Sequence, residues 1–117
     1  DGPMSLGRLR CDGTVAAVRR DPSGRPCAWL AVGATHLENG GHALVQADAA
    51  MTIAAAITPD GGRVDSAGPG GAVRLWWPRP PQAVRRGADA VDHTAGNDAL
   101  GLSLRAREDQ VVIGAAP

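Results

Sequence analysis

The stretch Val73-Arg74-Leu75-Trp76-Trp77-Pro78-Arg79-Pro80-Pro81 (residues 73–81) has a strand pattern and holds two of the three aromatic residues of the chain. Successive side chains of a strand point to opposite faces of its sheet. The alternation therefore places Val73, Leu75 and Trp77 in a core, and Arg74 and Trp76 on the other face. It follows that one tryptophan needs a partner other than this core.

Turn signals rich in Gly, Pro, Asn and Asp recur along the whole chain and separate segments of strand length. A second alternating segment, Leu100–Arg105, places three leucines on one face. The segment from Ala47 to Ala56 has helix propensity because of its alanines, but Thr52, Ile53 and a nearby proline favour a strand. The predicted strands are 13–20, 27–34, 42–47, 52–58, 63–66, 72–77, 83–86, 100–105 and 110–113.

This spacing predicts an all-β fold, an antiparallel, jelly-roll-like β-sandwich with short strands and Gly/Pro turns. The length of 117 residues predicts one domain, residues 1–117. The opening Asp1-Gly2-Pro3-Met4 is not a natural start, so either a longer chain was cut or Met4 marks the original start. We expect the domain to be the C-terminal fragment of a longer chain.

Composition excludes several classes of function. The formal net charge is zero and the arginines are spread from Arg8 to Arg107, which argues against binding nucleic acid through its phosphates. No apolar run has the length needed to span a bilayer, so no membrane association is expected. Without Phe or Tyr, the core must be filled by aliphatic side chains and three tryptophans.

Three groups of residues suggest chemistry but lack the arrangement for it. A hairpin at Asp21–Gly24 would place Cys27 opposite Val18 and far from Cys11, which predicts two buried thiols and no disulfide. A hairpin centred on residues 39 and 40 would place His36 and His42 close in space but on opposite faces, so no metal site is expected. His93 beside Asp92 does not form a dyad, because adjacent strand residues point apart. We expect no catalytic residue, metal or cofactor.

Trp76, Arg74 and Arg79 are the candidate ligand-binding residues. An indole offers an apolar face to the C–H face of a pyranose, and an arginine pairs with a carboxylate or sulfate. The same tryptophan could instead be covered by a loop or another protein domain. The stretch predicts either an acidic polysaccharide or a domain interface as the partner.

Three segments resemble the C-terminal β-sandwich of heparinase II/III-like polysaccharide lyases. They are the opening through Arg25-Pro26, the run Leu30–Leu37 followed by Gly40–Val45, and the closing run from Pro81 through Leu100–Leu104 to Val111–Ile113. The resemblance implies a non-catalytic accessory domain of a carbohydrate-active enzyme, packing on its catalytic domain and extending its glycan cleft. It also implies a periplasmic or secreted parent enzyme.

Three further functions stay open beside this one. The chain could be an independent carbohydrate-binding module that uses the Trp-Arg patch. It could be a protein-interaction or assembly module that uses strand edges or the Pro-Arg-Pro-Pro loop. An enzyme in its own right is the weakest of these alternatives, because the sequence offers no catalytic constellation.

Overall fold

The computed structural model describes residues 4–6, 9–40, 42–79, 81–96 and 98–114, with only the backbone described for residues 4–6. Within these residues the chain forms strands and turns, and no helix that could cross a membrane is present in them. The strands are β1 (Met4–Leu6), β2 (Leu9–Cys11), β3 (Val15–Arg20), β4 (Pro26–Asn39), β5 (His42–Thr58), β6 (Gly61–Gly68), β7 (Gly71–Trp76), β8 (Ala83–Arg86), β9 (Asp89–Ala90), β10 (His93–Gly96), β11 (Ala99–Leu104) and β12 (Arg107–Gly114).

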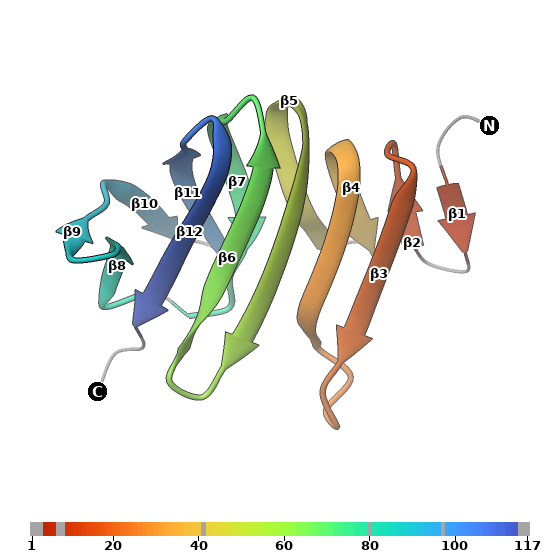
Figure 1. Ribbon diagram of the computed structural model, residues 1–117. Helices are drawn as coiled ribbons and strands as arrows, with labels where there is room; N and C mark the ends of the chain where they lie inside the picture. Colours follow the sequence, from red (N-terminus) through yellow and green to blue (C-terminus); the bar gives the residue numbers. More distant parts are fainter. Residues whose placement is uncertain (1–3, 7–8, 41, 80, 97, 115–117) are drawn as a thin grey trace.

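All strand pairs are antiparallel, and hydrogen bonds link the strands into one curled sheet (Figure 1). The main order is β1-β2-β4-β5-β6-β12-β8-β9, while β3 pairs with β4, β7 with β5 and β11, and β10 with β11. The prediction of an all-β antiparallel fold is confirmed. Its finer description as a jelly-roll-like sandwich stays a prediction.

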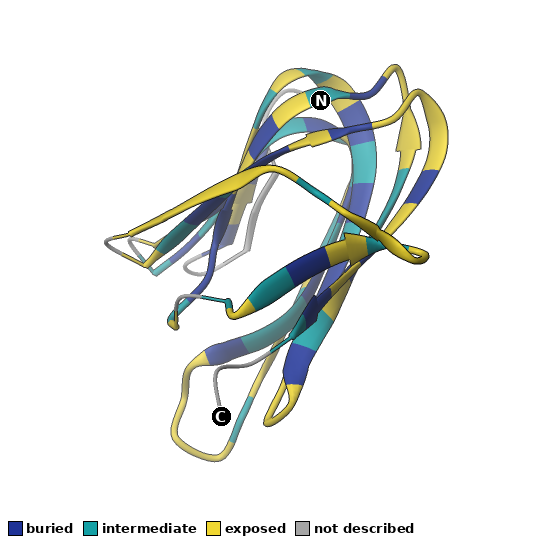
Figure 2. Cartoon of the chain, turned by 90° about the vertical axis from the view of Figure 1, so that its left-hand side faces the viewer, coloured by how far each residue is buried: buried dark blue, intermediate teal, exposed yellow. Residues whose placement is uncertain are grey.

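The two long strands, β4 and β5, fold the sheet over on itself. One part of each strand pairs within a front half of the sheet, with β3 and β6, and the other part pairs within a rear half, with β2 and β7. The front half also contains β12 and β8, and the rear half β11 and β10 (Figure 1). Figure 2 shows the fold edge-on, with the bend at the top and the two halves below it.

A side-chain hydrogen bond shows how far β4 doubles back. Arg20 lies beside Pro26 at the first end of β4, yet its guanidinium donates a hydrogen bond to the side-chain oxygen of Asn39 at the other end. A straight strand of this length would hold its ends about 40 Å apart. The bend therefore brings both ends of β4 together at one end of the molecule, which we call the open end.

The bend of β4 has identifiable causes. Gly33 has a φ of 61°, a left-handed conformation that glycine adopts without steric cost, and the pairing of β4 with β5 shifts register three times between Ala31 and Glu38. The carboxylate of Asp12 accepts hydrogen bonds from the backbone N–H groups of Thr35 and His36, both at 2.9 Å. These bonds attach the chain before β3 to the outside of the bend.

Apolar side chains fill the space inside the curl. Val64 on β6 pairs with Val111 on β12 in the front half, and Leu75 on β7 pairs with Leu100 on β11 in the rear half; all four are buried. Alternation correctly predicts that Leu100, Leu102 and Leu104 point inward. The outer surface of the front half carries the other set of side chains, among them Val15 and Val112, which are 48% and 55% exposed.

An ion pair reinforces the far side of the front half. The Arg86 guanidinium on β8 forms two hydrogen bonds with the Asp109 carboxylate on β12, at 2.8 and 2.6 Å. The backbone N–H of Arg105 also donates to Asp109, at 2.8 Å. These bonds, the guanidinium above all, hold the pKa of Asp109 below its usual value, although burial of the carboxyl opposes them.

The register of the first hairpin differs from the prediction. Val18 pairs with Trp29 rather than with Cys27, because the turn is longer than predicted: Arg20 pairs with Pro26 and a bulge follows. Cys11 and Cys27 are both free thiols, but the expectation that both are buried is wrong for Cys27. Cys11 is buried and Cys27 is partly exposed.

Strand boundaries differ from the prediction in several respects, and β4 continues to Asn39 where the predicted strand ends at residue 34. The two strands predicted at 42–47 and 52–58 are one continuous strand, β5, and the segment 47–56 is a strand as expected. Four short strands, β1, β2, β9 and β10, were not predicted. Each has four residues or fewer, too short for an alternation pattern to be read from sequence.

Candidate functional site

The three tryptophans meet at the open end of the curled sheet. Trp29, on β4, lies between the other two indoles, with ring centroids 6.2 Å from Trp76 and 6.4 Å from Trp77, both edge to face. Trp77 also covers Gly62 on β6, where an added Cβ would lie 2.6 Å from its ring. The cluster joins the front and rear halves of the sheet.

The prediction that Trp76 faces away from the core is wrong. Its exposed fraction is 9%, and that of Trp77 is 4%. Alternation fails here because β7 ends at Trp76, where the chain leaves the regular strand and the Trp77 N–H donates to the Asp98 carbonyl at 3.0 Å. Val73, Leu75 and Trp77 are buried as predicted, and Arg74 is exposed.

Trp76 nevertheless contributes to the walls of two pockets. The first encloses about 300 Å³ on the outer surface of the rear half and includes His42, Gln46, Arg74 and Asp98. Gln46 and Arg74 are cross-strand partners on β5 and β7. The His42 ring lies 5.5 Å from the Trp76 ring, so this pocket combines an aromatic wall with a cation and hydrogen-bonding groups.

The second pocket, of about 530 Å³, lies at the open end itself. Its lining includes Trp76 at the end of β7 and Pro78 and Arg79 just after it. Asp21 and Arg25 contribute from the turn before β4, and Cys27 from the start of β4. Arg74 is absent from this lining and Arg79 from that of the first pocket. The structure therefore distributes the predicted binding residues over two adjacent pockets that share Trp76.

The turn beside the second pocket is ordered by Asp21. Its carboxylate accepts hydrogen bonds from the Ser23 hydroxyl at 2.6 Å, the Ser23 N–H at 2.9 Å and the Arg25 N–H at 3.0 Å. The Ser23 hydroxyl bond is the main reason that the pKa of Asp21 lies below its usual value. The turn thus holds the backbone of Arg25 at the pocket rim, with the Asp21 carboxylate ionised at neutral pH.

The histidines do not form the arrangement predicted for them. The hairpin pairs Asn39 with His42, two residues off the predicted register, so His36 lies opposite Gln46 and not near Ala43. Within the described residues, no group of three or more His, Cys, Asp or Glu side chains is placed to hold a metal ion. His93 Nδ1 lies 3.2 Å from the Val91 carbonyl oxygen, which can accept a hydrogen bond from it.

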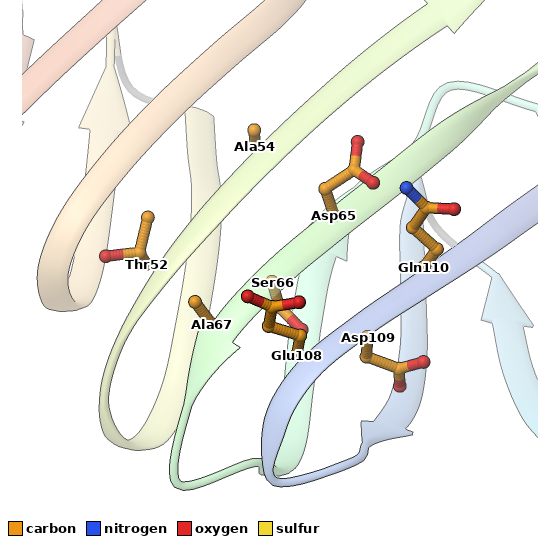
Figure 3. Close-up of a pocket in the computed structure, with 8 residues that line it drawn as sticks. All are labelled: Thr52, Ala54, Asp65, Ser66, Ala67, Glu108, Asp109 and Gln110. Atoms are coloured by element: carbon orange, nitrogen blue, oxygen red, sulfur yellow. The ribbon is translucent and has the colours of Figure 1, made fainter.

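A third pocket, of about 420 Å³, lies over β5, β6 and β12 in the front half (Figure 3). Register places Asp65, Ala67 and Glu108 on the outer surface, whereas Asp109 pairs with Ser66 toward the inside. Asp65 is already in an ion pair with Arg63, at 2.9 Å. This depression is lined by carboxylates and small side chains, and the sequence analysis gave no indication of it.

Three residues of the Trp76 region were missed from the sequence. Sequence patterns do not single out Trp29, which lies in the predicted strand 27–34, or Arg25, which follows the predicted turn. They point to His42, in the predicted strand 42–47, only as a possible metal ligand. Their positions depend on the folding over of β4 and β5, which no short-range pattern reports. Compared with known proteins, the sequence matches no protein-family model and no curated protein.

Proposed function

We propose that this chain is a non-catalytic accessory domain that binds acidic glycan chains at the two pockets beside Trp76. The observation that carries the proposal is the shared indole wall, with Arg74 on one side and Arg79 and Arg25 on the other. The likeness of the sequence to the C-terminal sandwich of heparinase II/III-like lyases supports the same class of ligand. In such an enzyme the domain would extend the glycan cleft.

Each pocket has an arginine to pair with an anionic group and also a carboxylate of its own, Asp98 in the first pocket and Asp21 in the second. Neither Arg74 nor Arg79 forms an ion pair with a carboxylate of the described residues, where the ion pairs are Arg63–Asp65 and Arg86–Asp109. Both arginines are exposed, so each guanidinium is available to a uronate carboxylate or a sulfate group. Such contacts are charge-assisted and can be bidentate.

Trp76 would define the shape of the two pockets more than it would add contact area for a bound sugar. With 9% of its surface exposed, the indole cannot serve as an open stacking platform for a sugar ring. It forms part of the wall of each pocket, and its packing against Trp29 fixes where that wall lies. We therefore expect the arginines to dominate affinity, and weak binding with a dissociation constant on the order of 1 mM.

Calorimetric titration with a uronate oligosaccharide and a neutral oligosaccharide of equal length tests this proposal. We expect heat only from the uronate, and at least a threefold weaker affinity for Arg74→Gln, Arg79→Gln or both. Arg107→Gln is a matched control, because Arg107 is an exposed arginine of β12 that lines neither pocket. Equal affinity for the uronate and the neutral oligosaccharide would contradict the proposal. So would an Arg107→Gln variant that weakens uronate binding as much as Arg74→Gln or Arg79→Gln does.

A second candidate function is packing against a catalytic domain, and the outer surface of the front half favours it. Val15 and Val112 are exposed there by about half of their surface, and Ala17, two residues from Val15 on β3, is exposed as well. Replacing Val112 by Thr should then weaken association with the parent enzyme's catalytic domain while leaving the uronate titration unchanged.

A further inference from the structure

The strand β3 forms one edge of the front half of the sheet, and this edge is unprotected. β3 pairs with β4 on one side, and on its other side no strand pairs with it among the described residues (Figure 1). Natural proteins protect such edges with proline, charge or very short strands, because unpaired N–H and C=O groups can pair with another chain. β3 has six residues, and the first four, Val15 to Val18, carry no charge and no proline.

Of the two arginines at the end of β3, one is not available to protect the edge. Arg20 donates hydrogen bonds to Asn39 and to the carbonyl of Gly24, so its guanidinium is held at the open end of the fold. Arg19 is exposed. β10, another edge strand, has only four residues and includes Gly96, so β3 offers the longer row of backbone groups.

We propose that β3 is a self-association edge, on which a second copy of this chain pairs antiparallel through its own β3. Antiparallel pairing of the same strand satisfies two-fold symmetry, since each residue then meets the same surface on its partner. In a pairing centred on Ala17, Arg19 lies opposite Val15 of the second copy, so the arginines of the two copies lie at opposite ends of the interface. The second copy's β3 is thus complementary in hydrogen bonding.

Side-chain directions fit this arrangement. Ala16 and Val18 pack against the core of their own chain, while Val15 and Ala17 point to the outer surface. Pairing would extend the front half of the sheet into a continuous sheet across both copies, with the two Ala17 side chains side by side and each Val15 opposite Arg19 of the other copy. A six-residue edge is a small interface, so we expect a dissociation constant on the order of 100 µM.

Sedimentation velocity on the complete chain, from about 10 µM to about 1 mM, measures this equilibrium. Ala17 lies near the middle of β3, hence near the two-fold axis, so Ala17→Lys places two ammonium groups across the interface. We expect it to raise the dissociation constant at least tenfold. Mixing Ala17→Lys with Ala17→Glu should restore association, because the heterodimer then carries opposite charges there.

Ala67→Lys is the control, since Ala67 is an exposed alanine of β6 on the same outer surface but away from the edge. Circular dichroism verifies that each variant is folded. Should Ala17→Lys not fold, Val15→Lys carries the same test, because Val15 is 48% exposed. A monomer at every concentration, association unchanged by Ala17→Lys, or equal weakening by Ala67→Lys would each overturn the proposal.

Discussion

Replacing Gly62 by alanine tests how closely the tryptophan cluster packs on the front half of the sheet. An added Cβ would lie 2.3 Å from the Ala56 carbonyl oxygen, and 2.6 and 2.7 Å from two ring carbons of Trp77. Ordinary contacts of this kind are about 3.5 Å or more, so backbone or indole must move by about 1 Å. Gly62 has no positive φ, so the expected effect is steric and not one of backbone strain.

The expected loss of unfolding free energy follows from two opposing effects. Overpacking of a close-packed interior costs about 1–3 kcal/mol. Replacing glycine by alanine also restricts the unfolded chain, which returns about 0.4–1 kcal/mol. We expect a net destabilisation of about 1–2 kcal/mol, which corresponds to a drop of about 1 M in the urea midpoint for a domain of this size.

Gly114→Ala is the matched control. A Cβ at Gly114 would meet Ala83 at 3.7 and 3.9 Å, which is ordinary contact. This variant should keep the stability of the original chain or gain up to about 1 kcal/mol. Urea unfolding followed by tryptophan fluorescence measures both variants, and Gly62→Ala should also alter the near-ultraviolet circular dichroism of the indoles. Equal stability of the two variants would refute the packing described here.

Three further predictions follow from the core and its charges. Trp76→Ala and Trp77→Ala should each lower stability by about 3 kcal/mol or more in urea unfolding, since both indoles are buried; a mild effect at Trp76 would contradict its burial. Because the pKa of Asp109 is lower in the folded state, its contribution is present above the unfolded pKa and is lost as pH falls through the folded pKa, so Asp109→Asn should flatten the acid limb of a stability-pH curve below about pH 4. Thiol titration should find two free cysteines after denaturation, and in the native state Cys27 should react well before the buried Cys11.

Sequence reasoning was reliable wherever burial follows from local alternation. The inward leucines of β11 and the pair Val73 and Leu75 were predicted correctly, because a regular strand turns every second residue to the same side. It failed at Trp76, the last residue of β7. There the chain leaves the strand, and the direction of a side chain depends on what the rest of the fold places beside it.

In the candidate site, too, the sequence predicted some of the residues but not how the fold arranges them. Sequence chemistry selected Trp76, Arg74 and Arg79 because indole and guanidinium groups suit acidic sugars. It could not show that two pockets separate the arginines, nor that Arg25 and His42 contribute to them. These residues lie far apart along the chain, and no short sequence pattern predicts contacts between residues so distant in sequence.

The amino-acid sequence by itself determined where most of the longer strands lie and which face of each regular strand is apolar, since these depend on backbone preference and on side chains a few residues apart. Only the tertiary structure decided where those faces meet. The bends of β4 and β5 bring the ends of each long strand together, and with them Trp29, Trp76 and Trp77. That closure depends on Gly33, on the Asp12 hydrogen bonds and on packing between distant strands, and such cooperative contacts exist only in the folded chain.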